Sequence, residues 1–296
     1  MEQTTNKLTY YLKKFLISIK KFVKLFFANS KATFGTCVML FFILLAIFGP
    51  IIFPYDETTN ALNKFAKPSA QYFLGTDELG RDLFRRLVNG TRDVLTIALF
   101  TSIFAVSFGV VLGMISGLFG GITDRIIQLV TNLFLSIPSF PMMLMMSAFL
   151  QIDDSISLAL VLAIFNWAGL CRAVRAQIIS IKERDFILIC KVMNLSKSHI
   201  IFKELLPNVA SYILVNFILI MRSAIIGSVG IMMLGLASFD PSNWGAVLNS
   251  AKSVILVSDA TLLWLSPILA IMLFQTAALF LANGLDEILN PRLKKN

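Results

Sequence analysis

The sequence predicts an all-α integral membrane protein with six transmembrane helices, preceded by an amphipathic helix at the N-terminus. Of its 296 residues, 57% are hydrophobic and only 15% are charged, whereas about a quarter of a soluble domain is charged. The mean hydropathy is +0.79. This composition excludes a disordered chain, a disulfide-rich secreted module and a collagen-like fibre, and it argues strongly against a soluble enzyme.

Six apolar stretches are long enough to cross a bilayer, which takes roughly 20 residues. They are 33–54, 94–118, 126–150, 155–178, 209–236 and 260–283. We therefore divide the chain into a basic arm (1–32), a first transmembrane helix (33–54), an extracellular segment (55–93), a five-helix core (94–283) with a cytoplasmic loop at 179–208, and a cytoplasmic tail (284–296).

The arm carries apolar residues at three- and four-residue spacing with lysines between them. The apolar positions are Leu8, Tyr11, Leu12, Phe15, Ile19, Phe22, Val23 and Phe26. This pattern predicts a basic amphipathic helix on the inner leaflet. Seven lysines in 1–32, the lack of a small-residue cleavage site and direct continuation into a full-length span argue against a cleaved signal peptide.

The distribution of lysine and arginine predicts the orientation. With the N-terminus in the cytoplasm, the inner segments (1–32, 119–125, 172–208 and 284–296) hold 18 basic residues and the outer segments hold seven. The positive-inside rule therefore places both termini in the cytoplasm. The net charge of +9 reflects this topology, so we expect membrane lipids, and no nucleic acid, as partners.

Two features of the spans suggest how they pack. Gly109, Gly113 and Gly117 are four residues apart, a spacing that allows close helix contact. Pro138 and Pro141 predict a kink near 136–141, either as a pore-lining break or as packing geometry.

Arg222 is the only charge deep in a span. Burying it there costs about 2.5–3.5 kcal/mol on insertion scales. A place on the translocation path, an inter-subunit ion pair and snorkelling toward the interface all remain open for it.

Catalytic signatures are absent from the sequence. It contains no phosphate-binding G-x-x-x-x-G-K-[ST] loop, no H-E-x-x-H and no G-x-S-x-G. The three cysteines have no metal-site spacing, and the single histidine, His199, has no local partner for binding a metal. We therefore expect a chain that is not an enzyme and holds no metal or cofactor, so that any energy source lies in a partner.

The longest inner segment, 172–208, is periodic enough to fold. An apolar set ends at Asn194, and Ser196 is placed to cap a second short helix that ends before Pro207. The apolar set is Phe186, Ile187, Ile189, Cys190 and Met193. With a basic rim of Lys191, Lys197 and Lys203, two short helices joined by a bend suit docking into a groove on a soluble partner.

This loop resembles that of bacterial ABC-importer permeases of the oligopeptide/dipeptide/nickel class, over the stretch R-A-V-R-A-Q-I-I-S-I-K-E-R-D-F-I-L-I-C-K-V-M-N-L-S-K-S-H-I-I-F-K-E-L-L-P-N. F-L-G-T-D-E-L-G-R-D at 73–82 is similar to the segment after the first span of the C-type subunit. Further matches follow in order: G-G-I-T-D-R at 120–125, S-I-P-S at 136–139, W-A-G-L-C-R-A-V-R at 167–175, N-W-G at 243–245 and G-L-D-E-I-L-N-P-R at 284–292. The resemblance covers about 73–292.

The resemblance implies a type I importer permease fold and a multi-pass place in the bacterial plasma membrane. It implies ATP-driven import of a small solute, an oligopeptide or dipeptide, by alternating access. The implied partners are a second homologous permease subunit, two cytoplasmic ATPase subunits that use the ATP, and an extracellular solute-binding protein. Nickel or another metal–chelator complex is the alternative solute; a membrane-embedded lipid enzyme and a passive channel are remote alternatives.

Carried over by position, the ATPase-coupling element spans about 184–207. Its candidate residues are Arg184, Asp185, Phe186, Ile189, Cys190, Lys191, Asn194, Ser196, Lys197 and Pro207. The family's Glu-Ala-Ala aligns with Leu188, Ile189 and Cys190, so the bulkier side chains here imply a wider groove in the ATPase. The family's glycine aligns with Asn194, and asparagine also tolerates a left-handed backbone.

The family's acidic residue near the end of the fifth span aligns with Ser228. Together with Arg222, Pro138 and Pro141, Ser228 forms our candidate set for the translocation path. These departures from the family pattern bear on the identity of the solute and of the partners.

The extracellular motif is Gly75, Thr76, Asp77, Gly80, Arg81 and Asp82. Its two aspartates are placed to pair with Arg81, Arg85 or Arg86, and Asp82 and Arg86 have the i,i+4 spacing of a helical ion pair. A structural brace is the main interpretation; contact with the binding protein or the solute is the other.

Overall fold

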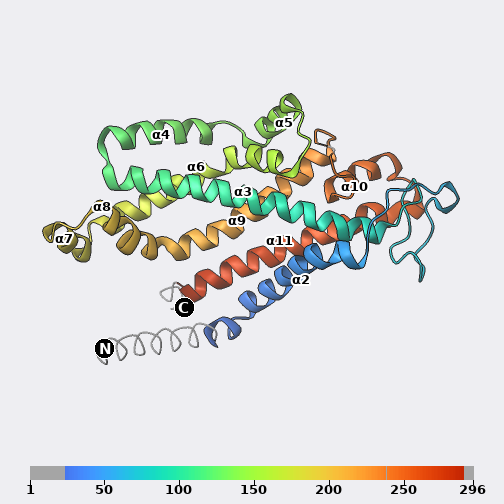
Figure 1. The fold of residues 1–296 in the computed structure, drawn as a ribbon, viewed down its shortest axis with the longest axis horizontal. Helices are drawn as coiled ribbons and strands as arrows, with labels where there is room; N and C mark the ends of the chain where they lie inside the picture. Colours follow the sequence, from blue (N-terminus) through green and yellow to red (C-terminus); the bar gives the residue numbers. More distant parts are fainter. Residues whose placement is uncertain (1–23, 238, 290–296) are drawn as a thin grey trace, which may run out of the picture.

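The computed structural model describes residues 24–237 and 239–289 and shows an elongated bundle of helices (Figure 1). The main helices are α2 (Ser30–Ile52), α3 (Leu83–Phe119), α4 (Gly121–Ser136), α5 (Ser139–Leu150), α6 (Ser155–Lys182), α7 (Asp185–Val192), α8 (Lys197–His199), α9 (Leu206–Met233), α10 (Trp244–Ala251) and α11 (Thr261–Leu289). Short turns of other helix types are η1 (Ala61–Asn63), η2 (Ile200–Leu205), η3 (Lys252–Val254) and η4 (Ser258–Ala260). In the described part of the chain, β pairing is limited to one bridge between Thr76 and Asp82.

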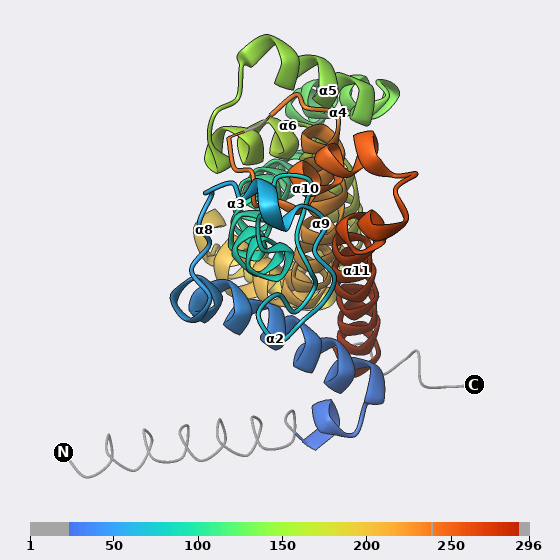
Figure 2. The same cartoon turned by 90° about the vertical axis from the view of Figure 1, so that its right-hand side faces the viewer.

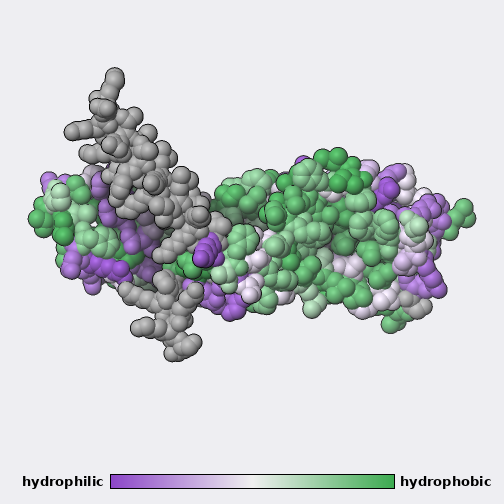
Figure 3. All heavy atoms as spheres, turned by 90° about the horizontal axis from the view of Figure 1, so that it is seen from below, coloured by the Kyte–Doolittle hydropathy of each residue, from purple (hydrophilic) through white to green (hydrophobic). Residues whose placement is uncertain are grey.

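The long helices run along the bundle, with α7 and α8 at one end and α10 at the other (Figure 1). We call these the α7 end and the α10 end. Among the described residues, five helices are long and apolar enough to cross a membrane, or six if α4 and α5 count as one span. Figure 3 shows a broad apolar belt between more polar ends. This is the pattern expected for a multi-pass membrane protein.

Two predicted boundaries differ from the structure. α3 begins at Leu83, so that 83–93, predicted as part of the extracellular segment, is helical and continuous with the second span. The reason is a capping signal: the side chain of Asp82 accepts a hydrogen bond from the backbone N–H of Arg85. Toward the C-terminus, α11 continues to Leu289. The helix therefore extends past residue 284, the predicted start of the cytoplasmic tail. Residues 1–23, most of the predicted amphipathic arm, lie outside the described residues, as do 290–296.

The third predicted span is broken. α4 and α5 meet at 87°, with the break at Ile137 and Pro138. The residue before a proline avoids helical backbone angles, and Ile137 is extended (φ −87°, ψ 133°). Pro141 falls in the first turn of α5, where a missing N–H costs little. The predicted kink between 136 and 141 is therefore present, as a sharp corner.

The glycine stripe of α3 is the surface on which α6 packs. A Cβ atom on Gly109 would lie 2.8 Å from the carbonyl oxygen of Trp167, and one on Gly113 would lie 2.7 Å from that of Cys171. The two backbones are therefore close enough that only glycine fits.

On the opposite side, α2 packs on α3 and α11, and Phe42 joins Trp244 and Phe274 in edge-to-face contacts. Figure 2 shows α2 and the α4–α5 pair on opposite sides of the bundle.

Candidate functional site

The loop between α6 and α9 forms a projecting bend at the α7 end (Figure 1). α7 ends at Val192, and Asn194 in the turn that follows has a left-handed backbone (φ 53°). The N–H of Leu195 then donates to the carbonyl of Cys190 at 3.0 Å, the pattern that closes a helix after a left-handed residue. Asparagine tolerates this conformation better than other residues with side chains, so the bend predicted at this position is retained.

The second half of the loop differs from the prediction. Ser196 caps α8 by accepting from the N–H of His199 at 3.2 Å. The helix does not end before Pro207, however: it continues through η2, a π-helical turn, directly into α9. The N–H of Leu206 donates to the carbonyl of Ile201, five residues back. This wider turn accommodates Pro207, which has no backbone N–H to donate and whose ring needs additional space.

α7 has two faces. Ile187 and Cys190 are buried and belong to the core cluster around α6 and the start of α9. Cys190, predicted with Ile189 to face a partner, thus faces the bundle instead, because it lies three residues from Ile187 on the same side of the helix. The opposite face forms an exposed apolar ridge. It consists of Leu188, Ile189, Val192 and Met193, with exposed fractions of 45%, 57%, 87% and 65%.

Three of the remaining coupling candidates lie at the start of α7. Arg184 and Asp185 are exposed at the start of α7, and Phe186 is half-buried against the core. The side chain of Lys191 lies outside the described part of the structure.

The base of the loop is fixed to the bundle by two lysines. Lys197 Nζ lies 4.8 Å from the ring centroid of Phe119 at the end of α3, a cation–π distance. Lys182 Nζ donates to the carbonyl oxygen of Gly117 at 3.0 Å. These two contacts join the loop to the end of α3.

A salt bridge joins α4 to α6 near this end. Arg175 Nε and Nη2 donate to Asp124 Oδ1 and Oδ2 at 2.6 and 2.5 Å, and Ser116 of α3 also donates to Asp124 Oδ1. Two-point pairing of this kind fixes orientation as well as distance. We did not predict this pair, although both residues lie in the motifs G-G-I-T-D-R and W-A-G-L-C-R-A-V-R.

At the α10 end, the motif at 73–82 folds around Asp77, whose side chain is fully buried. Asp77 Oδ1 accepts from the backbone N–H groups of Leu79 and Arg81 at 2.9 Å each. Asp77 Oδ2 accepts from Arg81 Nε at 2.7 Å and Arg86 Nη1 at 2.8 Å. Gly75 and Gly80 supply the left-handed residues of the tight loop, with φ of 77° and 76°.

Arg86 extends this network to α10. Its side chain is only 2% exposed, and it also donates to the carbonyl of Pro241 at 2.8 Å and to Ser250 Oγ at 3.1 Å. Burial tends to lower the pKa of the neighbouring Arg81, but the charge and hydrogen bond of Asp77 outweigh it, so the pKa of Arg81 is raised. Asp82 Oδ2 lies 3.3 Å from Arg85 Nε, so Asp82 pairs with Arg85 and not with Arg86. The reason is that Asp82 is the N-cap of α3, while the side chain of Arg86 points toward Asp77.

The N-W-G motif at 243–245 attaches α10 to α3. Asn243 caps α10 by accepting from the N–H of Gly245 at 2.8 Å, and its amide donates to Asp93. Asp93 also accepts from the hydroxyl of Ser155 at the start of α6. Trp244 is buried and donates its Nε1–H to the carbonyl of Leu87 at 3.1 Å. The α10 end is thus a hydrogen-bonded cap over α3 and α6.

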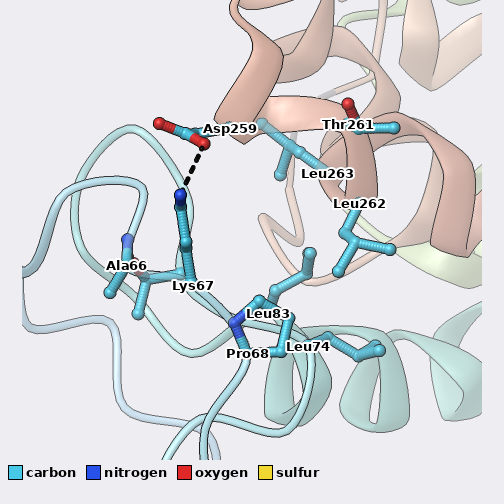
Figure 4. A pocket seen from close by; sticks show the side chains of 10 residues that line it. Ala66, Lys67, Pro68, Leu74, Leu83, Asp259, Thr261, Leu262 and Leu263 are labelled. Carbon is cyan, nitrogen blue, oxygen red and sulfur yellow. Dashed lines mark hydrogen bonds and ion pairs between the residues drawn. The ribbon is translucent and has the colours of Figure 1, made fainter.

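A small cavity of about 170 Å³ lies where the segment before α3 meets the start of α11. Figure 4 shows Lys67 and Asp259 pointing toward one another across it, with 3.7 Å between Nζ and Oδ1. Both side chains are more than half exposed, so this pair contributes little to stability.

The predicted path residues lie in different environments. Arg222 on α9 donates through Nε to Gln275 Oε1 of α11 at 2.6 Å, and Gln275 donates back to the carbonyl of Arg222 at 3.0 Å. Ser228 is buried, and its hydroxyl donates a hydrogen bond to the carbonyl of Ile225. Pro138 and Pro141 are exposed at the α4–α5 corner. Ser228 therefore does not line an open surface of this chain.

Comparison with known proteins agrees with this architecture. Residues 109–295 match the family model "Binding-protein-dependent transport system inner membrane component", and residues 19–68 match "N-terminal TM domain of oligopeptide transport permease C".

The chain is 34% identical to the dipeptide transport system permease protein DppC of Alkalihalophilus pseudofirmus, over 90% of this chain and 87% of that protein. It is 30% identical to the oligopeptide transport system permease protein OppC of Bacillus subtilis, over 91% and 88%. It is 29% identical to the glutathione transport system permease protein GsiD of Pectobacterium atrosepticum, over 93% and 91%. The chain therefore belongs to the family of binding-protein-dependent transport system inner membrane components and is a permease subunit of an ABC importer rather than an enzyme.

Proposed function

We propose that this chain is the C-type permease subunit of an importer that carries dipeptides or oligopeptides across the bacterial plasma membrane by alternating access. The similar proteins named for dipeptide and oligopeptide transport support a peptide as the solute. The observation that carries the mechanism is the exposed apolar ridge of α7, which projects beyond the bundle at the α7 end.

In this proposal the α7 end and both termini are cytoplasmic. The excess of basic residues in the inner segments supports this orientation. The α10 end, with the motif around Asp77, then faces the outside, where an extracellular solute-binding protein delivers the peptide. The motif itself acts as a brace, because Asp77 is fully buried and cannot touch a docking protein.

Two cytoplasmic ATPase subunits, which use the ATP, and a second homologous permease complete the importer. The ridge residues Leu188, Ile189, Val192 and Met193 enter a groove of one ATPase. Arg184, Asp185 and Lys197 lie at its margins, and Phe186 and Cys190 hold α7 to the bundle. Closure of the ATPases moves the loop, and the contacts of Lys197 with Phe119 and of Arg175 with Asp124 pass the movement to α3 and α4.

The Asn194→Pro variant tests this role. Proline fixes φ near −65° and cannot adopt the left-handed angle of Asn194, so the bend and the position of α7 are lost. In proteoliposomes with all subunits, ATP hydrolysis should continue while peptide uptake falls to background.

Asn194→Gly is the matched control, because glycine adopts the same angle freely, and it should transport as the native chain does. Normal uptake by Asn194→Pro, at normal membrane abundance, would refute the coupling role of this loop.

A further inference from the structure

α6 carries a polar face that none of the functional assignments above uses. Asn166, Gly169 and Arg172 are three residues apart and therefore lie on one side of the helix. The opposite side of α6 is apolar and buried against the glycine stripe of α3, through residues such as Trp167 and Cys171.

Two neighbouring helices add polar side chains at the margins of this face. Ser223 of α9 donates its hydroxyl to Asn166 Oδ1 at 3.1 Å. Arg172 donates through Nη2 to Asn132 Oδ1 of α4 at 2.6 Å. Asn132, Arg172 and Ser223 are exposed. We call Asn132, Asn166, Gly169, Arg172 and Ser223 the α6 polar face; it lies between α4 and α9.

The centre of the face is open. A Cβ atom placed on Gly169 would meet no other atom within 4 Å. This contrasts with Gly109 and Gly113, whose added Cβ atoms would collide with α6.

Toward the α10 end, the face is closed by α5. A Cβ on Gly230 of α9 would lie 2.9 Å from the ring of Phe140, and one on Gly227 would lie 2.9 Å from Leu162 and 3.9 Å from Met143 Sδ. Because the third span is broken between α4 and α5, α5 packs over both α9 and α6 on the α10 side of Asn166. The face is accordingly covered at the α10 end and uncovered toward the α7 end.

Contact with lipid tails does not suit this composition. Polar and charged side chains in a span normally face water or protein, since exposure to hydrocarbon costs several kcal/mol. Arg172 takes part in none of the ion pairs found between described residues. Its bond to Asn132 occupies one of the five N–H donors of a guanidinium.

We infer that the α6 polar face lines the water-filled path of the transported solute and that Arg172 there binds a carboxylate of that solute. This inference rests on the proposed peptide-import function, since a peptide carries a carboxylate at its C-terminus. A guanidinium pairs with a carboxylate through two parallel hydrogen bonds, and the amides of Asn132 and Asn166 and the hydroxyl of Ser223 match the donors and acceptors of a peptide backbone.

Thiol labelling tests the path. The parent importer carries Cys37→Ala in this chain, because Cys37 is exposed while Cys171 and Cys190 are buried. The amount of maleimide that this parent binds is the baseline. Asn166→Cys, Gly169→Cys and Ser223→Cys are then introduced one at a time. In inside-out vesicles, a charged, membrane-impermeant maleimide should label all three, and a transported dipeptide should slow the labelling.

The matched control is Ile164→Cys, also on α6 and 42% exposed, but facing an apolar groove with Phe104 and Phe134. It should stay at the baseline. If the three test positions stay at the baseline as well, the face is a dry protein contact and the inference is wrong.

Two substitutions test the carboxylate role. Arg172→Gln should lower uptake of a dipeptide with a free C-terminus at least about tenfold, equivalent to about 1.4 kcal/mol, by raising the KM for uptake. Arg172→Lys, which keeps the charge, should recover most of the uptake. ATP hydrolysis stimulated by the loaded binding protein reports that Arg172→Gln is folded and assembled.

Unchanged uptake with Arg172→Gln would overturn the carboxylate role. A parent importer that takes up no peptide at all would instead refute the proposed function. Normal peptide uptake together with unlabelled cysteines would refute only the claim that the α6 polar face lines the solute path.

Discussion

At the scale of single residues, the carboxylate of Asp77 is held from several sides. It is fully buried and bonded to two guanidinium groups and two backbone N–H groups. Arg86 is itself almost fully buried, so its charge depends on Asp77. Removing one partner of such a pair leaves an uncompensated buried charge.

Asp77→Ala should therefore lower the free energy of unfolding by about 3–5 kcal/mol. Asp82→Ala, five residues away, removes a helix cap and a half-exposed ion pair and should cost about 1 kcal/mol. Thermal unfolding of the two purified variants in the same detergent compares them. Equal and small shifts for both would contradict the brace that we assign to this motif.

At the scale of helices, α3 and α6 form the central unit of the bundle, with the most extensive helix contact in the described structure. Glycines on α3 bring the two backbones together, and the Asp124–Arg175 bridge then attaches α4 to the same unit. The two lysine contacts of the loop between α6 and α9 reach the end of α3 as well. In the proposed function, a movement of this loop would therefore act on one unit rather than on separate helices.

Gly113→Ala tests this contact with the smallest possible change. The added Cβ would lie 2.7 Å from a backbone oxygen of α6, so the helices must separate, at a cost of about 1–3 kcal/mol. The control, Gly169→Ala on α6, adds the same methyl group where no atom lies within 4 Å. Unfolding in detergent should show a loss of stability for Gly113→Ala and none for Gly169→Ala; the reverse order would mean that the helices do not pack through the stripe.

At the scale of the whole molecule, the two ends of the bundle have different characters. The α10 end is capped by hydrogen bonds among the motif at 73–82, α3 and α10. The α7 end instead exposes an apolar ridge. In the proposed function the hydrogen-bonded end stays closed, and the end with the exposed ridge is the one that the ATPases move.

This arrangement makes a prediction about topology. Leu62 in the segment before α3 is 96% exposed and Val192 in α7 is 87% exposed, and they lie near opposite ends of the bundle. A membrane-impermeant thiol reagent should label Leu62→Cys in intact spheroplasts and Val192→Cys only in inside-out vesicles, each in the Cys37→Ala parent. Labelling of both from the same side would refute the proposed orientation.

Much of the fold was predictable because its signals are local. Runs of apolar residues fix the spans, Ile137 and Pro138 fix the α4–α5 corner, and Asn194 fixes the bend after α7. Two of the differences from the prediction were also local in origin. The predicted helix end before Pro207 is wrong because a π-helical turn, which the sequence pattern does not reveal, carries the helix into α9. α3 begins before the predicted span because its first turns are less apolar than a span requires.

Hydropathy, charge bias and ordered motifs can be read along the chain, and they are enough to identify a helical membrane permease of a known transport family. Three features required the folded structure: Cys190 faces inward while Ile189 faces outward, Arg86 is bound by Asp77, and a polar face of α6 stays open between α4 and α9. These features depend on helix rotation and on contacts between residues far apart in the chain, which packing sets and local patterns do not encode.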